Sequence, residues 1–241
     1  MKIWRLSLSC LAAAGLASFG LAAGSQAFAQ AAPESVTGGQ TSAAAVSPAS
    51  VEGFRSARFG MDEAGVRDAI QSDFGVAAEA ILSGTNPAER TQILSVEGVD
   101  VLDGGGAADV SYVFGYQSNE LSQVSVLWSA DADGAVDGDQ LVVNANVLQT
   151  FFLNAGYQPE SVVTNAPVPE GLLMFRGSDA DGRMAVLLLR GTLAAGETAA
   201  ADAEGESEPR AETVLTPTSL LLAYLANPQD PDVFQIEPGQ F

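Results

Sequence analysis

The chain has a single cysteine, Cys10, so no disulfide can form within it. Without a covalent cross-link, any fold of this chain must be held together by burial of apolar side chains. The composition allows this, because apolar residue types make up 47% of the 241 residues. The length suits one good core or two small halves.

The first residues have the pattern of a secretory signal peptide. Lys2 and Arg5 give a positively charged start, an apolar stretch follows, and the small residues of a cleavage site end at Ala29. We therefore expect cleavage before Gln30 and a periplasmic or secreted product. The apolar stretch is short and interrupted by Gly and Ser, so the pattern favours a cleaved leader over a stable membrane anchor.

The rest of the chain divides by composition. Residues 30–50 are small, polar and Pro-containing, which is typical of a disordered linker. Residues 51–241 are predicted to form a single α+β domain, with halves at 51–130 and 131–241. Within it, residues 192–212 are rich in Ala, Glu and Gly, which predicts a mobile acidic loop.

The first predicted helix starts with a residue that can cap it. Asp62 can accept hydrogen bonds from the free N–H groups of the first turn, and Gly75 is placed to end the helix. The helical spacing of apolar residues predicts a buried face formed by Val66, Ala69, Ile70 and Phe74.

A second helix is predicted in the second half of the chain. Asp139 can cap a helix that runs through Ala155, and Gly156 is the expected left-handed stop. Val142 and Phe151 are expected to broaden its buried face. The helical repeat of that face consists of Leu141, Ala145, Leu148 and Phe152.

Alternation of apolar and polar residues predicts two β-hairpins. The first joins residues 108–116 to 121–128, and the second joins 172–176 to 184–189. Hairpins of this kind imply antiparallel pairing. Further short strands are predicted at 91–96, 161–164 and 218–225.

These elements predict an α+β fold in which two main helices pack on one face of an antiparallel sheet. A capped helix followed by a hairpin occurs once in each half of the domain. The pattern is that of two tandem helix-plus-hairpin halves.

Part of this pattern resembles a known family. The stretch Phe59–Val66, with the strand around Tyr112-Val113-Phe114 and the return strand Leu121–Trp128, resembles the SmpA/OmlA (BamE-type) envelope lipoproteins. Gly60-Met61 followed by Val66-Arg67 is similar to the Gly-Met helix start of that family. The doubled layout is similar to the tandem fold of β-lactamase inhibitor proteins. The resemblance implies a non-enzymatic envelope protein that works through protein contacts.

The residue types present exclude most enzyme chemistry. The sequence has no His, and its only Lys and Cys are Lys2 and Cys10 in the expected leader. It lacks a base to activate a serine, the soft ligands of a zinc hydrolase and the lysine of a phosphate loop. A carboxylate-pair hydrolase remains chemically open, since 30 acidic residues are present, but no spacing singles out a pair. We predict that the chain is not an enzyme.

One acidic stretch offers oxygen ligands for calcium. Its candidate ligands are Asp131, Asp133, Asp137 and Asp139. In an EF-hand alignment, however, Gln140 stands where a bidentate glutamate is wanted. The other interpretation is a turn, in which Asp and Gly are present because they suit the backbone conformation. It applies equally to Asp179–Gly182. We favour the turn, so no cofactor is expected, and calcium is the alternative.

The net charge of −20 predicts repulsion from nucleic acid and from anionic membranes. The same charge favours a cationic partner, or serves only solubility. Phe54, Arg55 and Phe59 cluster before the first helix and are candidate contacts for a partner protein, or else the edge of the core.

The sequence as a whole predicts an exported, non-enzymatic binding or assembly-accessory protein of the bacterial envelope. Its partner would be another envelope or secreted protein. The alternatives are a calcium-binding structural or adhesion protein and, third, a carboxylate-pair hydrolase.

Overall fold

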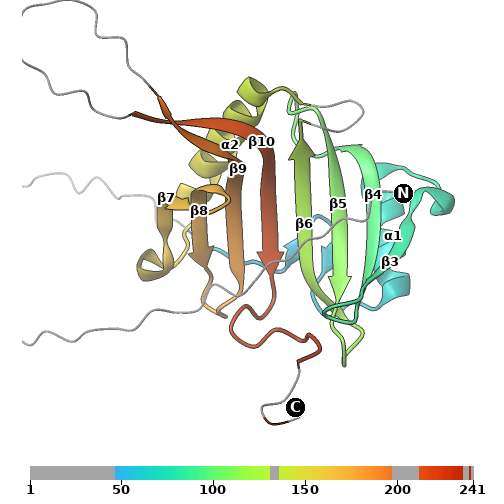
Figure 1. The fold of residues 1–241 in the computed structure, drawn as a ribbon. Helices are drawn as coiled ribbons and strands as arrows, with labels where there is room; N and C mark the ends of the chain where they lie inside the picture. Colours follow the sequence, from blue (N-terminus) through green and yellow to red (C-terminus); the bar gives the residue numbers. More distant parts are fainter. Residues whose placement is uncertain (1–46, 131–135, 197–211, 236–238, 240–241) are drawn as a thin grey trace, which may run out of the picture. The chain divides into compact units, whose positions relative to one another are not determined.

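The computed structural model describes residues 47–130, 136–196, 212–235 and 239 (Figure 1). These residues contain two helices, α1 (Glu63–Phe74) and α2 (Gly138–Leu153), and two 3₁₀ turns, η1 (Ala78–Ala80) and η2 (Pro159–Ser161). The strands in chain order are β1 (Gly53–Phe54), β2 (Ala57–Arg58), β3 (Leu82–Asn86), β4 (Thr91–Asp100), β5 (Ala107–Phe114), β6 (Leu121–Ser129), β7 (Val163–Val168), β8 (Gly171–Ser178), β9 (Met184–Gly196) and β10 (Glu212–Leu225).

Strands β3 to β10 form one eight-stranded sheet in the order β3-β4-β5-β6-β10-β9-β8-β7, seen face-on in Figure 1. Every neighbouring pair is antiparallel, and β1 and β2 form a separate two-stranded ribbon. The order divides the sheet into two four-stranded meanders. Their last strands, β6 and β10, pair at the centre, where Ser125 lies opposite Ala223.

The α+β class expected from the sequence, with two main helices on one face and two helix-plus-hairpin halves, is wrong. Within the described residues the fold is dominated by sheet, because ten strands accompany only two helices. Each half contributes four strands rather than one hairpin. The sequence carries no signal for β3 and predicts too short a strand for β7, because four of the five β3 residues and three of the six β7 residues are exposed and no strict alternation marks them.

The caps of α1 are confirmed. The Asp62 side chain accepts a hydrogen bond from the Gly65 N–H, and Gly75 takes the left-handed conformation that ends the helix. The expected cap of α2 is off by one half-turn. Asp137, not Asp139, accepts the bond from the Gln140 N–H, and the helix ends at Leu153 rather than at residue 155.

Both predicted hairpins are confirmed, as β5–β6 and β8–β9. The expected acidic loop at 192–212 is too long at both ends, because β9 continues to Gly196 and β10 begins at Glu212. Residues 197–211 lie outside the described residues, as do 1–29 of the expected leader and 30–46 of the expected linker. The last linker residues are described, and the Ala49 N–H donates to the Gly156 carbonyl.

The main core lies on one side of the sheet, together with the inner faces of both helices. Helix α2 contacts β8, β9 and β10, whereas α1 contacts β4 and β2. Phe152 of α2 stacks on Phe175 of β8 with ring centroids 5.2 Å apart, and Tyr157 and Tyr224 meet Phe152 edge-on. The largest fully buried side chains include Trp128, Tyr112, Phe114, Phe152 and Phe175. This aromatic content explains how a chain without disulfides can hold its fold.

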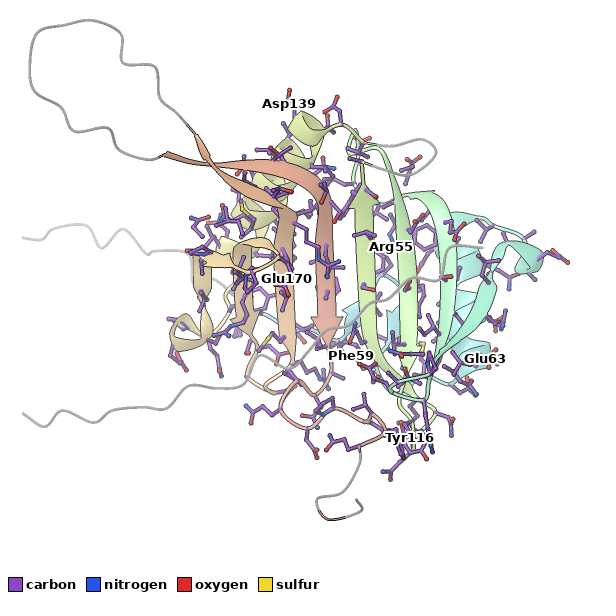
Figure 2. The ribbon with its side chains drawn as sticks, in the orientation of Figure 1. Arg55, Phe59, Glu63, Tyr116, Asp139 and Glu170 are labelled. Atoms are coloured by element: carbon purple, nitrogen blue, oxygen red, sulfur yellow. The ribbon has the colours of Figure 1, made fainter. Side chains whose placement is uncertain are left out.

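The segment after β10 returns to the turns at one end of the sheet. The Asp232 carboxylate accepts hydrogen bonds from the N–H groups of Gln117 and Ser118, both at 2.9 Å. Phe234 meets Tyr116 edge-on, and the Arg90 guanidinium lies 3.7 Å from the centre of the Phe234 ring. Figure 2 shows Tyr116 beside this tail. The tail therefore links the β3–β4 turn to the β5–β6 turn.

Candidate functional site

The predicted calcium ligands are only partly described. Asp131 and Asp133 lie outside the described residues. Asp137 is engaged as the cap of α2, since its Oδ1 accepts the Gln140 N–H at 2.7 Å. Asp139 is exposed in the first turn of α2, at the helix end labelled in Figure 2. The two described carboxylates thus lie at the N-cap and in the first turn of a helix.

The second acidic stretch, Asp179–Gly182, is a turn, as the backbone interpretation predicted. Asp179 is only 2% exposed, and its Oδ1 accepts bonds from the N–H groups of Asp181 and Arg183. Gly182 has a positive φ of 78°, which a glycine adopts without strain. Among the described residues, no group of three or more acidic, Cys or His side chains is arranged to hold a metal.

The predicted contact residues Phe54, Arg55 and Phe59 lie at the edge of the core. The ring of Phe54 stacks on Tyr224 at 6.0 Å, and Phe59 is half-buried against the core. Arg55 is exposed, but its guanidinium donates to the carbonyls of Asp73 and Asp100. These contacts tie the β1–β2 ribbon to the end of α1 and the end of β4. The structure therefore gives all three residues an internal role that would compete with partner binding.

A different surface stands out, and it lies on α2. Of the six large apolar side chains that are exposed in the described part of the chain, five belong to this helix. Val143, Val147 and Phe151 are 51, 50 and 63% exposed and follow one another at intervals of four residues. This spacing places them in one row, which we call the α2 stripe. The other two exposed residues of the helix are Val142 and Leu153.

The other helix provides a matched comparison. Helix α1 exposes Glu63, Asp68 and small residues, and Arg67 pairs with Glu63 at 2.9 Å. Helix α2 has only one charged residue, Asp139, in its 16 residues. A surface helix in so acidic a chain would be expected to carry charge on its outer face, as α1 does. The near absence of charged residues is therefore specific to α2 and is not shared by α1.

Helix α2 is held in a fixed orientation by polar contacts on its inner side. Asn144 is 1% exposed, and its Nδ2 donates to the Gly105 carbonyl at 2.7 Å, while Gln140 donates to its Oδ1. Gln149 donates to the carbonyl of Met174 on β8 and to Asn165 on β7. Both helix halves are therefore held by these bonds, which keep the α2 stripe on the outer side of the helix.

Polar residues beside the α2 stripe have partners within the helix. The Thr150 hydroxyl donates to the Asn146 carbonyl at 2.8 Å, and Asn154 Nδ2 donates to the Thr150 carbonyl at 2.7 Å. These groups are therefore partly satisfied by their own backbone, which lowers the cost of removing water from them. The outer face of α2 is chemically suited to be covered by another apolar surface.

Sequence reasoning placed Val142 and Phe151 in the buried face of this helix, and that prediction is wrong, since both are exposed. The signal that could have located the site was the row of apolar residues at 143, 147 and 151. It competed with the row that includes Leu141, Ala145 and Phe152, which is the buried one. A helix that is apolar on most of its circumference does not itself reveal which side faces the core.

No protein-family model, curated protein or solved structure matches the chain. The resemblance to the BamE-type lipoproteins therefore stays a prediction from short motifs. In the described residues, neither helix is long and apolar enough to cross a membrane.

Proposed function

We propose that this chain is an exported, non-enzymatic binding protein of the bacterial envelope, and that it contacts a partner protein through the outer face of α2. The observation that carries the proposal is the concentration of exposed apolar side chains on this one helix. Contiguous exposed apolar surface on a protein marks an interaction site more often than scattered residues do. An assembly-accessory role, which the family resemblance implies, would be one form of this function.

Covering the α2 stripe would supply one favourable apolar contribution to binding, to which polar contacts around it would add. Full burial of a Val or Phe side chain stabilises by about 1.5 to 3 kcal/mol. Since roughly half of each side chain in the α2 stripe is still exposed, each would contribute about 1 kcal/mol when covered. Three such residues, with Val142 and Leu153 at the margin, form the apolar centre of a small interface.

Charge indicates what kind of partner this is. With a net charge of −20, the chain is repelled by nucleic acid and by anionic lipid surfaces. An uncharged helix face avoids that repulsion locally and allows a protein surface to approach. We therefore infer a protein partner in the periplasm or outside the cell.

Photo-crosslinking in living cells tests this function. A photoreactive amino acid replaces Val147, and the same residue replaces exposed Ser72 on α1 in a matched control. We expect a discrete crosslinked partner from position 147 and none from position 72. The substitutions Val147→Asp and Phe151→Asp should abolish recovery of that partner, while Ser72→Asp, with the same added charge, should not.

Melting temperatures of all three Asp variants must stay close to that of the wild type for this comparison to hold. Equal recovery of the same partner by the wild type and by the Phe151→Asp variant would contradict the proposal. So would a partner that crosslinks from position 72 as efficiently as from position 147.

A further inference from the structure

The eight-stranded sheet is open, and its two outer strands differ. Strand β7 is interrupted in a way that discourages further pairing. Pro167 has no N–H to donate, and Asn165 takes a left-handed φ of 52° and has no partner in the register with β8. Natural proteins use such features to prevent another strand from adding to an edge.

Strand β3, at the other edge, has none of these features. Its sequence, Leu-Ser-Gly-Thr-Asn, contains no Pro and no charge, and none of its residues has a positive φ. Residues 82–85 are exposed, and Leu82 is the sixth exposed large apolar residue of the described chain. The strand pairs with β4 through all five residues without a bulge. A regular, uncharged edge of this kind can accept another strand.

The backbone of β3 has the groups that an added strand needs. In an antiparallel ladder, a strand that is paired on one side directs alternate N–H and C=O groups away from its partner. Among the described residues, no hydrogen bond outside the β3–β4 ladder involves the backbone of residues 82–85. A Cβ added at Gly84 would have no atom within 4 Å, so the face of the sheet at this residue is open and a larger side chain can be placed there without a clash.

A small pocket lies next to this edge, between β3, β4 and the first turn of α1. Its volume is about 210 Å³, and its lining includes Glu63, Ser83, Thr85 and Gln92. Figure 2 shows Glu63 on the β3 side of the sheet. Arg67 is directed to one side of the pocket, where its Nη2 donates to Glu63 Oε1 and to the Ser83 hydroxyl. The second carboxylate oxygen of Glu63 has no partner among the described residues.

We propose that β3 binds an extended, basic segment of a partner protein as an additional antiparallel or parallel strand of the sheet. Main-chain hydrogen bonds to β3 would supply the affinity, and a Lys, Arg or hydroxyl side chain in the pocket beside Glu63 would supply selectivity. The site is separate from the α2 stripe and does not depend on the function proposed for that helix.

Charge complementarity favours a basic segment over a second copy of the chain. Two copies, each with a net charge of −20, would repel one another if their β3 edges met. Exposed Glu79 in η1, three positions before Leu82, and exposed Asp68 on α1 add negative charge to this region. A segment with Lys or Arg would be attracted to the same region.

The test uses the purified full chain and a nine-residue peptide selected against it from a random display library. Hydrogen exchange should show slowed amides in residues 82–86 on peptide binding. A second peptide of the same sequence and charge, N-methylated at alternate residues, should bind at least 10-fold more weakly because it cannot donate to the edge. The Gly84→Lys variant should also lose at least 10-fold in affinity, whereas Gln229→Lys, the same charge change at an exposed residue of the tail, should not.

Three results would overturn the proposal. The first is a selection that yields no peptide protecting residues 82–86. The second is equal affinity of the N-methylated and unmodified peptides, because charge attraction alone would then account for binding. The third is concentration-dependent dimerisation of the chain that Gly84→Lys removes, because the edge would then pair with a second copy. Variants of the α2 stripe should leave peptide binding unchanged, so failure of either site can be distinguished from failure of the other.

Discussion

The Val51 N–H donates a 2.8 Å hydrogen bond to Oδ2 of Asp179, a residue 128 positions further along the chain. The same carboxylate closes the β8–β9 turn through its other oxygen. One buried side chain therefore fixes both a hairpin turn and the segment that leads into the β1–β2 ribbon.

Replacement of this carboxylate should be costly. Asp179→Ala leaves three backbone N–H groups without their acceptor, and we expect a loss of about 2 to 3 kcal/mol in the free energy of unfolding. Asp181→Ala is the matched control, since that side chain is 71% exposed and its ion pair with Arg183 is 3.9 Å long. It should change stability by less than about 0.5 kcal/mol. Urea unfolding measures both, and equal effects of the two variants would refute the role given to Asp179.

Removal of the buried Tyr112 hydroxyl should increase stability, whereas removal of the Asp179 carboxylate should decrease it. The Tyr112 hydroxyl oxygen is buried and has no hydrogen-bond partner in the described structure. Burial, assisted by the negative charge of Asp73, raises the pKa of this phenol well above its usual value. Tyr112→Phe removes an unsatisfied polar group and should raise the free energy of unfolding by about 1 kcal/mol. A loss of stability in urea unfolding would show that the hydroxyl is bonded, for example to an internal water.

The tail contact predicts a dependence on pH. Burial acts to raise the pKa of Asp232, but the hydrogen bonds from Ser118 and Gln117 outweigh it and leave this pKa below its ordinary value. A carboxyl whose pKa is depressed by folding stabilises the folded state above its unfolded pKa of about 3.9. That contribution is lost as the pH falls through the folded pKa.

Hydrogen exchange of residues 116–119 between pH 6 and pH 3 would follow this loss. We expect protection in the wild type to persist down to the ordinary Asp pKa of about 3.9 and to fall only at lower pH, where the folded carboxylate becomes protonated. In Asp232→Asn the protection should already be low at pH 6 and change little. An unchanged profile in the variant would show that another group controls the tail.

Calcium should have no effect on stability. The capping bond occupies Asp137, and a turn explains Asp179 and Asp181, so these three acidic residues have structural roles of their own. We expect the melting temperature to be the same in 1 mM calcium and in chelator. A rise that is reversed by chelator and lost in Asp137→Asn would instead support the calcium-binding alternative.

Local signals in the sequence were sufficient to predict several helices and strands of the fold. Asp62 and Gly75 mark the two ends of α1, because capping needs only residues adjacent in sequence. The alternation around Tyr112 and Trp128 marks strands whose alternate apolar side chains enter the core. These features depend on short-range geometry, so they could be identified without knowledge of the tertiary structure.

Other features depend on contacts distant in sequence. Strand β3 has no alternation because its side chains are exposed, and only its pairing with β4 makes it a strand. The α2 stripe could not be separated from the buried row, since the choice is made by β8–β10 and not by the helix itself. Neither of the two proposed binding surfaces, the α2 stripe and the β3 edge, could therefore be recognised from the local pattern of apolar residues.

The central pairing of β6 with β10 has a consequence for the order of folding. All other neighbouring strands of the sheet are close in sequence or joined within one half, whereas Ser125 and Ala223 are brought together from opposite halves. Such a distant contact carries a larger loop-closure cost and forms more slowly than local hairpins. We expect each meander to assemble first and the β6–β10 seam to close last. Pulse-labelled hydrogen exchange would then show the β10 amides that bond to β6 protected later than the β10 amides that bond to β9, and simultaneous protection would count against this order.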